Sequence, residues 1–349
     1  MNFIKGIILL IVAALLVTSC TNKSQHATVT TLAGNGSLGL VNGKGESASF
    51  SNPMGIAVDS SGNVYVADSR NNIIRKINTD GIVTTLAGSS VAGSADGKGS
   101  SASFFFPTAL AADAAGNVYV ADTHNSLIRR ITPDGVVTTL AGRLPANPVY
   151  KKNDTARFDN PYGIVADKKG NLFVCDWDKD VIKKISPTGK VTIFAGSGDR
   201  GSKDGIGTKA SFYLPEGIVI DSNDNLFITD TYNNMIRKIS PEGVVTTLAG
   251  KSAKGSADGK GTTASFNHPN GITIDKSGNL YVADMGNNKI RKITPDGMVS
   301  TFAGSKIHGS ANGDIAAASF YRPYGIAIDK NGSLYVADYQ NNLIRKINF

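Results

Sequence analysis

A repeat of 54 residues constrains the fold of this chain more than any other feature. A proline precedes the most regular segment of each unit, and successive prolines are 54 residues apart without exception. The six prolines are Pro53, Pro107, Pro161, Pro215, Pro269 and Pro323. A regular period of this length indicates six copies of one supersecondary unit, each packing mainly on its neighbours.

Each unit has the pattern of four short strands. In the first unit the strands are expected at 55–59, 64–68, 73–77 and 83–88, where β-branched and aromatic residues alternate with turns of Gly, Asn and Asp. No stretch after residue 20 has a convincing helical period. Six four-stranded units predict an all-β protein, a six-bladed β-propeller over residues 28–349.

The strand order also predicts how the ring closes. The sequence VTTLAG that ends the first unit is also present at 29–34, before any complete unit, whereas the sixth unit has only three strands. We expect residues 29–34 to supply the missing fourth strand of the last blade. The two ends of the chain would then share one sheet, and no blade would be left with an open edge.

The residues before the repeats have the pattern of an export signal. Lys5 precedes an apolar run at 7–17 that is too short for a permanent membrane anchor, and VTSC at 17–20 resembles the lipobox of bacterial lipoproteins. We expect a signal peptide at 1–19, then a lipidated Cys20 and a polar tether over 20–27. An ordinary secretory signal with an incidental cysteine is the alternative.

The lipobox resemblance implies a location. The protein would be lipid-anchored in the bacterial cell envelope, in the outer rather than the inner membrane because Thr21 is not acidic, with the propeller outside the cytoplasm. If Cys20 carries lipid, Cys175 has no intramolecular disulfide partner. Because Cys175 occupies a slot held by Ala or Thr in the other units, we expect it to be a packing residue.

The most regular stretch of each unit, PxGIxxDxxGNLYVADxxNNxIRKI, resembles the NHL repeat, and the resemblance extends over all six units. It implies the six-bladed propeller. It does not imply an activity, because the family includes enzymes, RNA binders and protein-binding sensor domains.

Two aspartates recur in every unit, as Asp59 and Asp68 do in the first. A ring of six carboxylates could hold a hard cation, but residues kept in all six units favour a structural role, with each Asp accepting N–H bonds from its own turn.

The third strands also carry twelve basic residues, and without them 24 basic residues remain against 28 acidic ones. We expect about half of the twelve to pair with Asp between blades, so the net charge of +8 does not indicate nucleic-acid binding.

The connections that follow the second and fourth strands open on one face, called here the loop-rich face. Most of the longer connections repeat GSADGKGxxASF, and their Ala and Phe, such as Ala102 and Phe104, are expected to plug the crevice between blades. The short turns, such as 60–63 and 78–81, open on the opposite face, the tight-turn face. Binding residues are expected on the loop-rich face.

The positions at which the units differ gather on the loop-rich face, around the central opening. They predict a set of ligand-binding residues: Tyr162, Trp177, Glu216, Tyr232, His268, Asn270, Arg322, Tyr324 and Tyr339. The third unit departs furthest, since its connection at 143–158 abandons the common pattern and Trp177 is the only Trp of the chain. Trp177 is either a ligand anchor or a cover for that connection.

The function predicted from these features is a binding module for a protein, small-molecule or glycan ligand. We expect a monomer that contacts the membrane through its lipid and binds no nucleic acid. The alternative is a metal-dependent lyase or lactonase of the NHL or gluconolactonase-like kind, in which Glu216, Asn270 and His268 would act around a divalent metal ion in the central channel. The sequence has no zinc-ligand spacing and no nucleophilic triad, so no definite cofactor or catalytic residue is predicted.

Overall fold

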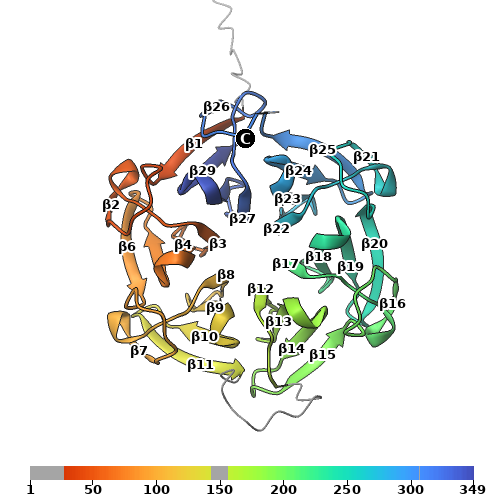
Figure 1. Cartoon of the computed structure of the whole chain (residues 1–349), viewed down its shortest axis with the longest axis horizontal. Coiled ribbons are helices and arrows are strands. Elements are labelled where there is room, and N and C mark those ends of the chain that lie inside the picture. Colours follow the sequence, from red (N-terminus) through yellow and green to blue (C-terminus); the bar gives the residue numbers. More distant parts are fainter. Residues whose placement is uncertain (1–26, 143–155, 306) are drawn as a thin grey trace, which may run out of the picture.

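The structure is a computed structural model that describes residues 27–142, 156–305 and 307–349. Six antiparallel sheets surround a central axis (Figure 1), which confirms the six-bladed β-propeller. From the axis outward, the first blade contains β3 (Pro53–Val58), β4 (Val64–Asp68), β5 (Ile73–Ile77) and β6 (Ile82–Ala87). Residues 1–26, which include the predicted signal peptide at 1–19 and all of the predicted tether at 20–27 except its last residue, lie outside the described part of the chain.

The other blades repeat this order. The second contains β8 (Pro107–Ala112), β9 (Val118–Asp122), β10 (Leu127–Ile131) and β11 (Val136–Gly142), and the third β12 (Pro161–Ala166), β13 (Leu172–Asp176), β14 (Val181–Ile185) and β15 (Val191–Ala195). The fourth contains β17 (Pro215–Ile220), β18 (Leu226–Asp230), β19 (Met235–Ile239) and β20 (Val244–Gly250), and the fifth β22 (Pro269–Ile274), β23 (Leu280–Asp284), β24 (Lys289–Ile293) and β25 (Met298–Ala303). The sixth contains β27 (Pro323–Ile328), β28 (Leu334–Asp338), β29 (Leu343–Asn348) and β1 (Thr28–Ala33).

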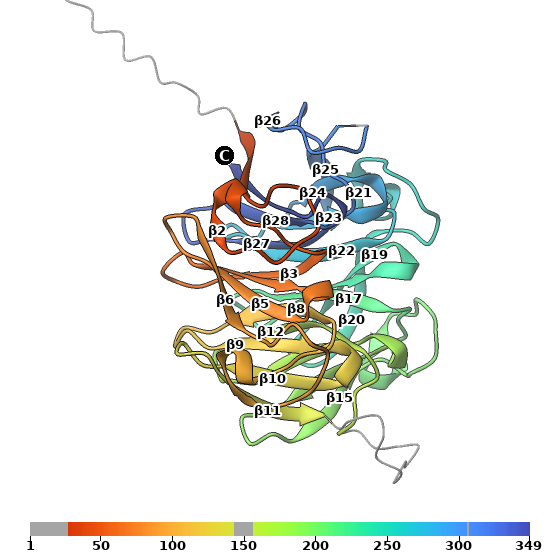
Figure 2. The ribbon, with the colours of Figure 1, turned by 60° about the vertical axis from the view of Figure 1, so that its left-hand side comes forward.

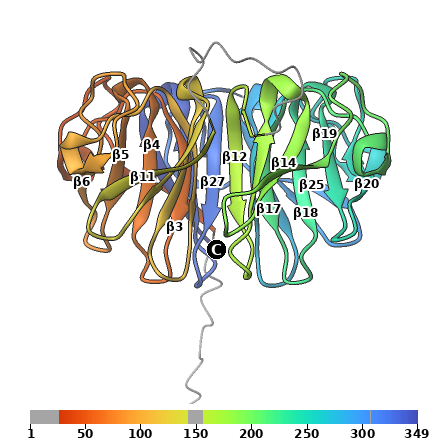
Figure 3. The same ribbon diagram turned by 90° about the horizontal axis from the view of Figure 1, so that it is seen from below.

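The sixth blade confirms the predicted closure. β1 pairs antiparallel with β29, and Val29 lies opposite Ile347. Figure 2 shows this first strand, in red, beside the blue strands of the C-terminal end. Figure 3 shows the C-terminus at the face opposite the short helices, so β29 ends at the tight-turn face. Because Thr28 lies opposite Asn348 in the antiparallel pair, β1 starts at that face and runs toward the loop-rich face.

The four predicted strands are present in every blade, and most of the described sheets have one strand more. In five of the six sheets a fifth strand of two residues lies at the outer edge; these are β2 (Gly43–Lys44), β7 (Gly97–Lys98), β16 (Gly205–Ile206), β21 (Gly259–Lys260) and β26 (Gly313–Asp314). Each belongs to a long connection that leaves the loop-rich face, descends along the blade and returns. Pairing with the outermost strand gives partners to backbone groups that would otherwise form an open edge.

Short 3-10 helices occupy the two kinds of connection. One kind follows each second strand at the loop-rich face: η2 (Ser69–Asn71), η4 (Thr123–Asn125), η5 (Trp177–Lys179), η7 (Thr231–Asn233), η9 (Met285–Asn287) and η10 (Tyr339–Asn341). The other kind lies in the long connections: η1 (Gly45–Ser47), η3 (Gly99–Ser101), η6 (Gly207–Lys209) and η8 (Gly261–Thr263). Within the described residues no helix has the length and apolarity needed to cross a membrane.

The hydrophobic core is divided into six clusters, one between each pair of neighbouring blades. In one of them Ala102 and Phe104 of a long connection are fully buried with residues of the first and second blades, which confirms their role as plugs. Cys175 is free and fully buried in the cluster between the third and fourth blades, where it packs as predicted.

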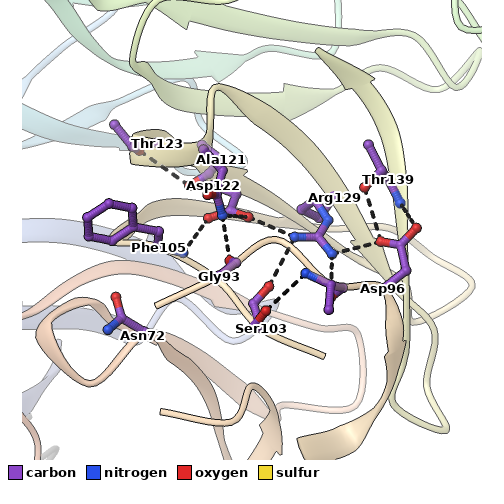
Figure 4. Close-up of polar contacts among 12 residues, drawn as sticks. Asn72, Gly93, Asp96, Ser103, Phe105, Ala121, Asp122, Thr123, Arg129 and Thr139 are labelled. Carbon is purple, nitrogen blue, oxygen red and sulfur yellow. Dashed lines mark hydrogen bonds and ion pairs between the residues drawn. The ribbon is translucent and has the colours of Figure 1, made fainter. Parts of the chain in front are cut away.

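The repeated aspartate of the second strand is a structural residue, but its partners differ from those predicted. In the second blade (Figure 4) Asp122 accepts hydrogen bonds from the backbone N–H of Phe105 at 2.8 Å and from the guanidinium of Arg129 at 2.8 Å. Arg129 also donates to Asp96 of the preceding connection at 2.7 Å. The prediction that these charges pair between blades is wrong. The ion pair of Asp122 with Arg129 joins β9 and β10, which are adjacent strands of one blade. The other terminal nitrogen of the guanidinium binds Asp96 and so holds the long connection against the blade.

The other blades repeat this ion pair between fully or almost fully buried side chains: Asp68–Arg75, Asp176–Lys183, Asp230–Arg237, Asp284–Arg291 and Asp338–Arg345. The aspartate column of the tight-turn face is structural as predicted. Asp59 accepts N–H bonds from Ser61 and Asn63 of its own turn and the hydroxyl of Tyr65 at 3.0 Å.

Candidate functional site

A cavity of about 70 Å³, called here the central cavity, lies on the propeller axis at the loop-rich end of the innermost strands. In β17 an irregularity in the pairing between Pro215 and Ile218 places Glu216 at the wall of this cavity. Gly217 follows because its backbone packs against the backbone carbonyl of Asn270 in the next blade, where a Cβ atom would collide. Such close contacts between innermost strands explain why the cavity is small.

Glu216 is the acidic group of the cavity, and its residue is only 8% exposed. The amide nitrogen Nδ2 of Asn270 donates to Oε2 of Glu216 at 2.5 Å, and the hydroxyl of Tyr324 donates to the same oxygen at 2.6 Å. Burial raises the pKa of Glu216 to about 7, although these hydrogen bonds favour the ionised form. The carboxyl group is therefore held in a fixed orientation and titrates near neutral pH.

Four aromatic side chains stand beside the cavity. Tyr162 stacks on Trp177 with a ring-centroid distance of 5.3 Å, and Tyr324 contacts Tyr339 at 5.9 Å. The indole N–H of Trp177 is buried without a hydrogen bond of normal geometry in the described chain, yet it lies close enough to lower the pKa of Glu216. The structure thus brings six of the nine predicted ligand-binding residues together at the central cavity.

The prediction that Trp177 serves as a ligand anchor is consistent with this position. The competing prediction, a cover for the unusual third connection, falls largely on residues 143–155, which lie outside the described chain.

The other three predicted residues form a separate group on the same face. Tyr232 is 42% exposed, and its ring lies 5.0 Å from that of His268. Burial lowers the pKa of His268, and the positive charges of Lys254 and Arg322 lower it further. No hydrogen bond or ion pair of the described residues joins His268 to Glu216, so the structure supports the predicted pair of Glu216 with Asn270 but does not add His268 to it.

The histidines of the described chain do not gather around a common point. His124 stacks on Phe106 at 4.7 Å and His308 on Tyr321 at 4.5 Å, each against aromatic residues of its own part of the face. Among residues 27–142, 156–305 and 307–349, no three His, Cys, Asp or Glu side chains are placed to hold a metal ion. The described geometry therefore offers the predicted divalent ion one carboxylate, Glu216, with the amide of Asn270.

A second hollow on the loop-rich face, called here the rim pocket, has a volume of about 490 Å³ and was not predicted. Its lining includes Leu38, Asn52, Arg70, Phe106, Tyr339 and Gln340. Asn52, Arg70, Phe106 and Gln340 occupy columns that vary among the units, so a signal was present in the sequence. Leu38 belongs to a long connection whose path the repeat pattern does not define. Since Tyr339 contacts Tyr324, the rim pocket adjoins the central cavity.

Comparison with known protein families identifies the kind of repeat from which the propeller is built. The model of the teneurin NHL domain matches residues 34–95 and 250–317, and that of the NHL repeat matches 212–239 and 320–347. The chain is thus a six-bladed β-propeller built of NHL repeats. NHL repeat-containing protein 2 of Gallus gallus is 31% identical over 88% of this chain, but the match covers only 40% of that longer protein.

Solved structures show the same fold. A structural genomics protein of unknown function from Bacteroides thetaiotaomicron superposes with a TM-score of 0.73 at 23% identity, covering 92% of this chain and 75% of that one. An auxiliary nutrient binding protein from the same organism superposes with a TM-score of 0.71 at 19% identity, covering 92% and 76%. At these identities the likeness establishes the fold alone.

Proposed function

We propose that this protein is an exported, lipid-anchored binding module whose loop-rich face holds a small-molecule, glycan or protein ligand. The observation that carries the proposal is the gathering of six symmetry-breaking residues around the central cavity, with the rim pocket beside it. By contrast, the aspartates that recur in all six units are used by the fold itself, as Asp122 is in its pair with Arg129. Aromatic residues with a few fixed polar groups are typical of ligand sites.

The two hollows suggest how a ligand is held. The central cavity admits only a small group, whereas the rim pocket has room for a larger body. Tyr324 lines the first and Tyr339 lines the second, and their rings are in contact. The fold shared with an auxiliary nutrient binding protein supports a nutrient-like ligand by analogy.

Binding at this face can be measured through Trp177, the only Trp of the chain. Neutral oligosaccharides and short peptides would be titrated against residues 21–349 while the tryptophan fluorescence is recorded. We expect one class to change the fluorescence saturably, and Tyr339→Ala to weaken binding at least tenfold because an aromatic anchor is lost. Lys330→Ala, at an exposed turn of the tight-turn face, is the matched control. Equal binding by both variants, or no response to any member, would contradict the proposal.

We also propose that Cys20 carries the lipid and that the loop-rich face points away from the membrane. The orientation is supported by β1, which starts at the tight-turn face, so a tether over 20–27 would join the propeller on that side. Full-length protein should partition into the detergent phase of a cell extract, and Cys20→Ser should move it to the aqueous phase. A Cys175→Ala control should remain with the detergent. Detergent partitioning that survives Cys20→Ser would refute lipidation at this residue.

A metal-dependent lyase or lactonase remains the second candidate. It rests on one contact, the hydrogen bond of Asn270 to Glu216, a carboxyl group whose pKa is raised to about 7 by burial. Calcium binding that is lost in Glu216→Gln would favour this candidate over the binding module.

A further inference from the structure

Glu216 differs from the other buried carboxyl groups in having no cationic partner. Each aspartate at the end of a second strand, such as Asp122, forms an ion pair with a buried Arg or Lys. Asp180, also buried, lies 3.6 Å from Arg200. No Lys, Arg or His of the described residues lies within salt-bridge distance of Glu216, and its Oε2 accepts hydrogen bonds from two neutral groups, the amide of Asn270 and the hydroxyl of Tyr324.

An ionised carboxylate at this position is incompletely compensated. Removing a charge from water is costly unless an opposite charge and hydrogen bonds replace the lost solvation. Asn270 and Tyr324 donate to Oε2, and the indole N–H of Trp177 also lies close to the carboxyl group, but none of these three groups carries a positive charge. A ligand that carries a positive charge would supply the missing counter-ion.

The surroundings of the cavity fit an organic cation better than a metal ion. Tyr162 and Tyr324 line the cavity, and Trp177 and Tyr339 extend their rings outward. Aromatic faces attract ammonium groups through their quadrupoles. A metal ion prefers several oxygen ligands, whereas this cavity offers one carboxylate, and the adjacent amide of Asn270 turns its nitrogen, not its oxygen, toward it.

We propose that the central cavity binds a primary ammonium group at the end of a flexible chain, with Glu216 as its counter-ion, Tyr162 and Tyr324 as its aromatic walls, and Trp177 stacked behind Tyr162. A volume of about 70 Å³ suits an ammonium head group and excludes a whole sugar ring or amino acid. The attached chain would leave past Tyr339 toward the rim pocket. This inference rests on the proposed binding role of the loop-rich face and names the ligand class for it.

The test is a calorimetric titration of residues 21–349 at pH 8. The cationic probes are n-pentylammonium chloride and N-acetyl-lysine amide, and the neutral probes of matched size are 1-pentanol and N-acetyl-norleucine amide. We expect both cationic probes to bind at least tenfold more tightly than their neutral counterparts, and Glu216→Gln to remove this preference. Tighter binding of the lysine derivative would indicate a peptide source, and tighter binding of pentylammonium a free amine.

Two controls keep the result interpretable. Glu242→Gln, an exposed carboxyl group at a turn of the tight-turn face, should bind as the unaltered chain does. Glu216→Gln should fold normally, since it removes an incompletely compensated buried charge, and an unfolding midpoint at pH 8 at or above that of the unaltered chain would verify this.

The pH dependence provides an independent readout. Tyr324, Tyr162 and the thiol of Cys175 act on Glu216, and burial raises the pKa of all three, so they remain neutral at pH 5–8. Trp177 and Asn270, the other neighbours of the carboxyl group, do not titrate. Only the ionised form of Glu216 attracts the cation, and its pKa is about 7. Affinity should therefore fall about tenfold for each pH unit below 7, in proportion to the ionised fraction.

Three outcomes would overturn the inference. The first is equal binding of cationic and neutral probes, and the second is ammonium binding that survives Glu216→Gln. The third is calcium binding that requires Glu216 and displaces the ammonium probes, which would favour the metal-dependent enzyme. If the ammonium probes fail while an oligosaccharide or peptide still changes the fluorescence of Trp177, only this inference is wrong. If neither class binds, the binding module is wrong as well.

Discussion

Replacing Arg129 with Met should lower the free energy of unfolding of residues 21–349 by about 3–5 kcal/mol, because removing one partner leaves a buried charge uncompensated. Asp122 and Arg129 are both fully buried, and their side chains are 2.8 Å apart. The substitution also releases the connection that Arg129 holds through Asp96 and through the carbonyl of Ala95 at 2.9 Å. Phe104, whose ring lies under the guanidinium, would lose its cover.

Chemical unfolding monitored by circular dichroism would measure this loss. Arg130→Met is the matched control, since Arg130 follows Arg129 on β10 and points to the opposite face of the sheet. Its expected loss is about 1 kcal/mol, because Arg130 is only partly buried and Asp122 keeps its partner Arg129. The double variant Asp122→Asn with Arg129→Met should recover part of the stability, because no uncompensated charge remains. Equal losses in Arg129→Met and Arg130→Met would contradict this account.

This ion pair also shows how far the sequence determines the fold. The period of 54 residues and the turn residues were enough to predict the blades, the strands within one or two residues, and the closing strand at 29–34. The fifth edge strands could not be predicted, since a pair such as Gly97–Lys98 has no alternating pattern. The partner of Arg129 could not be predicted either, because the path of the connection that carries Asp96 is set by tertiary contacts.

The candidate site was predictable only in part, because the sequence shows where the units differ but not which side chains meet in space. The residue after the second strand is Thr in the second blade, where Thr123 donates to the carbonyl of Pro161 in the next blade at 2.7 Å. In other blades this hydroxyl residue is replaced by Trp177, Met285 or Tyr339. Trp177 and Tyr339 direct their aromatic rings to the loop-rich face instead. Comparing units therefore found Glu216 and its neighbours. It could not show that Glu216 lacks a cation, since that depends on which side chains converge in space.

Removing β1 should cost about 5 kcal/mol or more, comparable with the whole stability of a typical domain. The deletion takes Val29 and Ala33, both fully buried, out of the core and leaves β29 without its outer partner. In the first five blades the four main strands follow one another along the chain. Only the sixth blade depends on a strand from the other end of the chain, so its loss opens the ring and exposes an edge that can pair with another molecule.

Two variants with different starting residues test this closure. A chain that starts at Gly36 should unfold at a much lower denaturant concentration than one that starts at Thr28, and it should self-associate in gel filtration. Conversely, Thr30→Cys with Lys346→Cys, which lie opposite each other in the β1–β29 pair, should form a disulfide and raise the free energy of unfolding by about 2–4 kcal/mol. The gain should vanish on reduction. If the shortened chain unfolds with unchanged midpoint and cooperativity, β1 does not hold the ring closed, because a strand that closes the propeller must contribute to its stability.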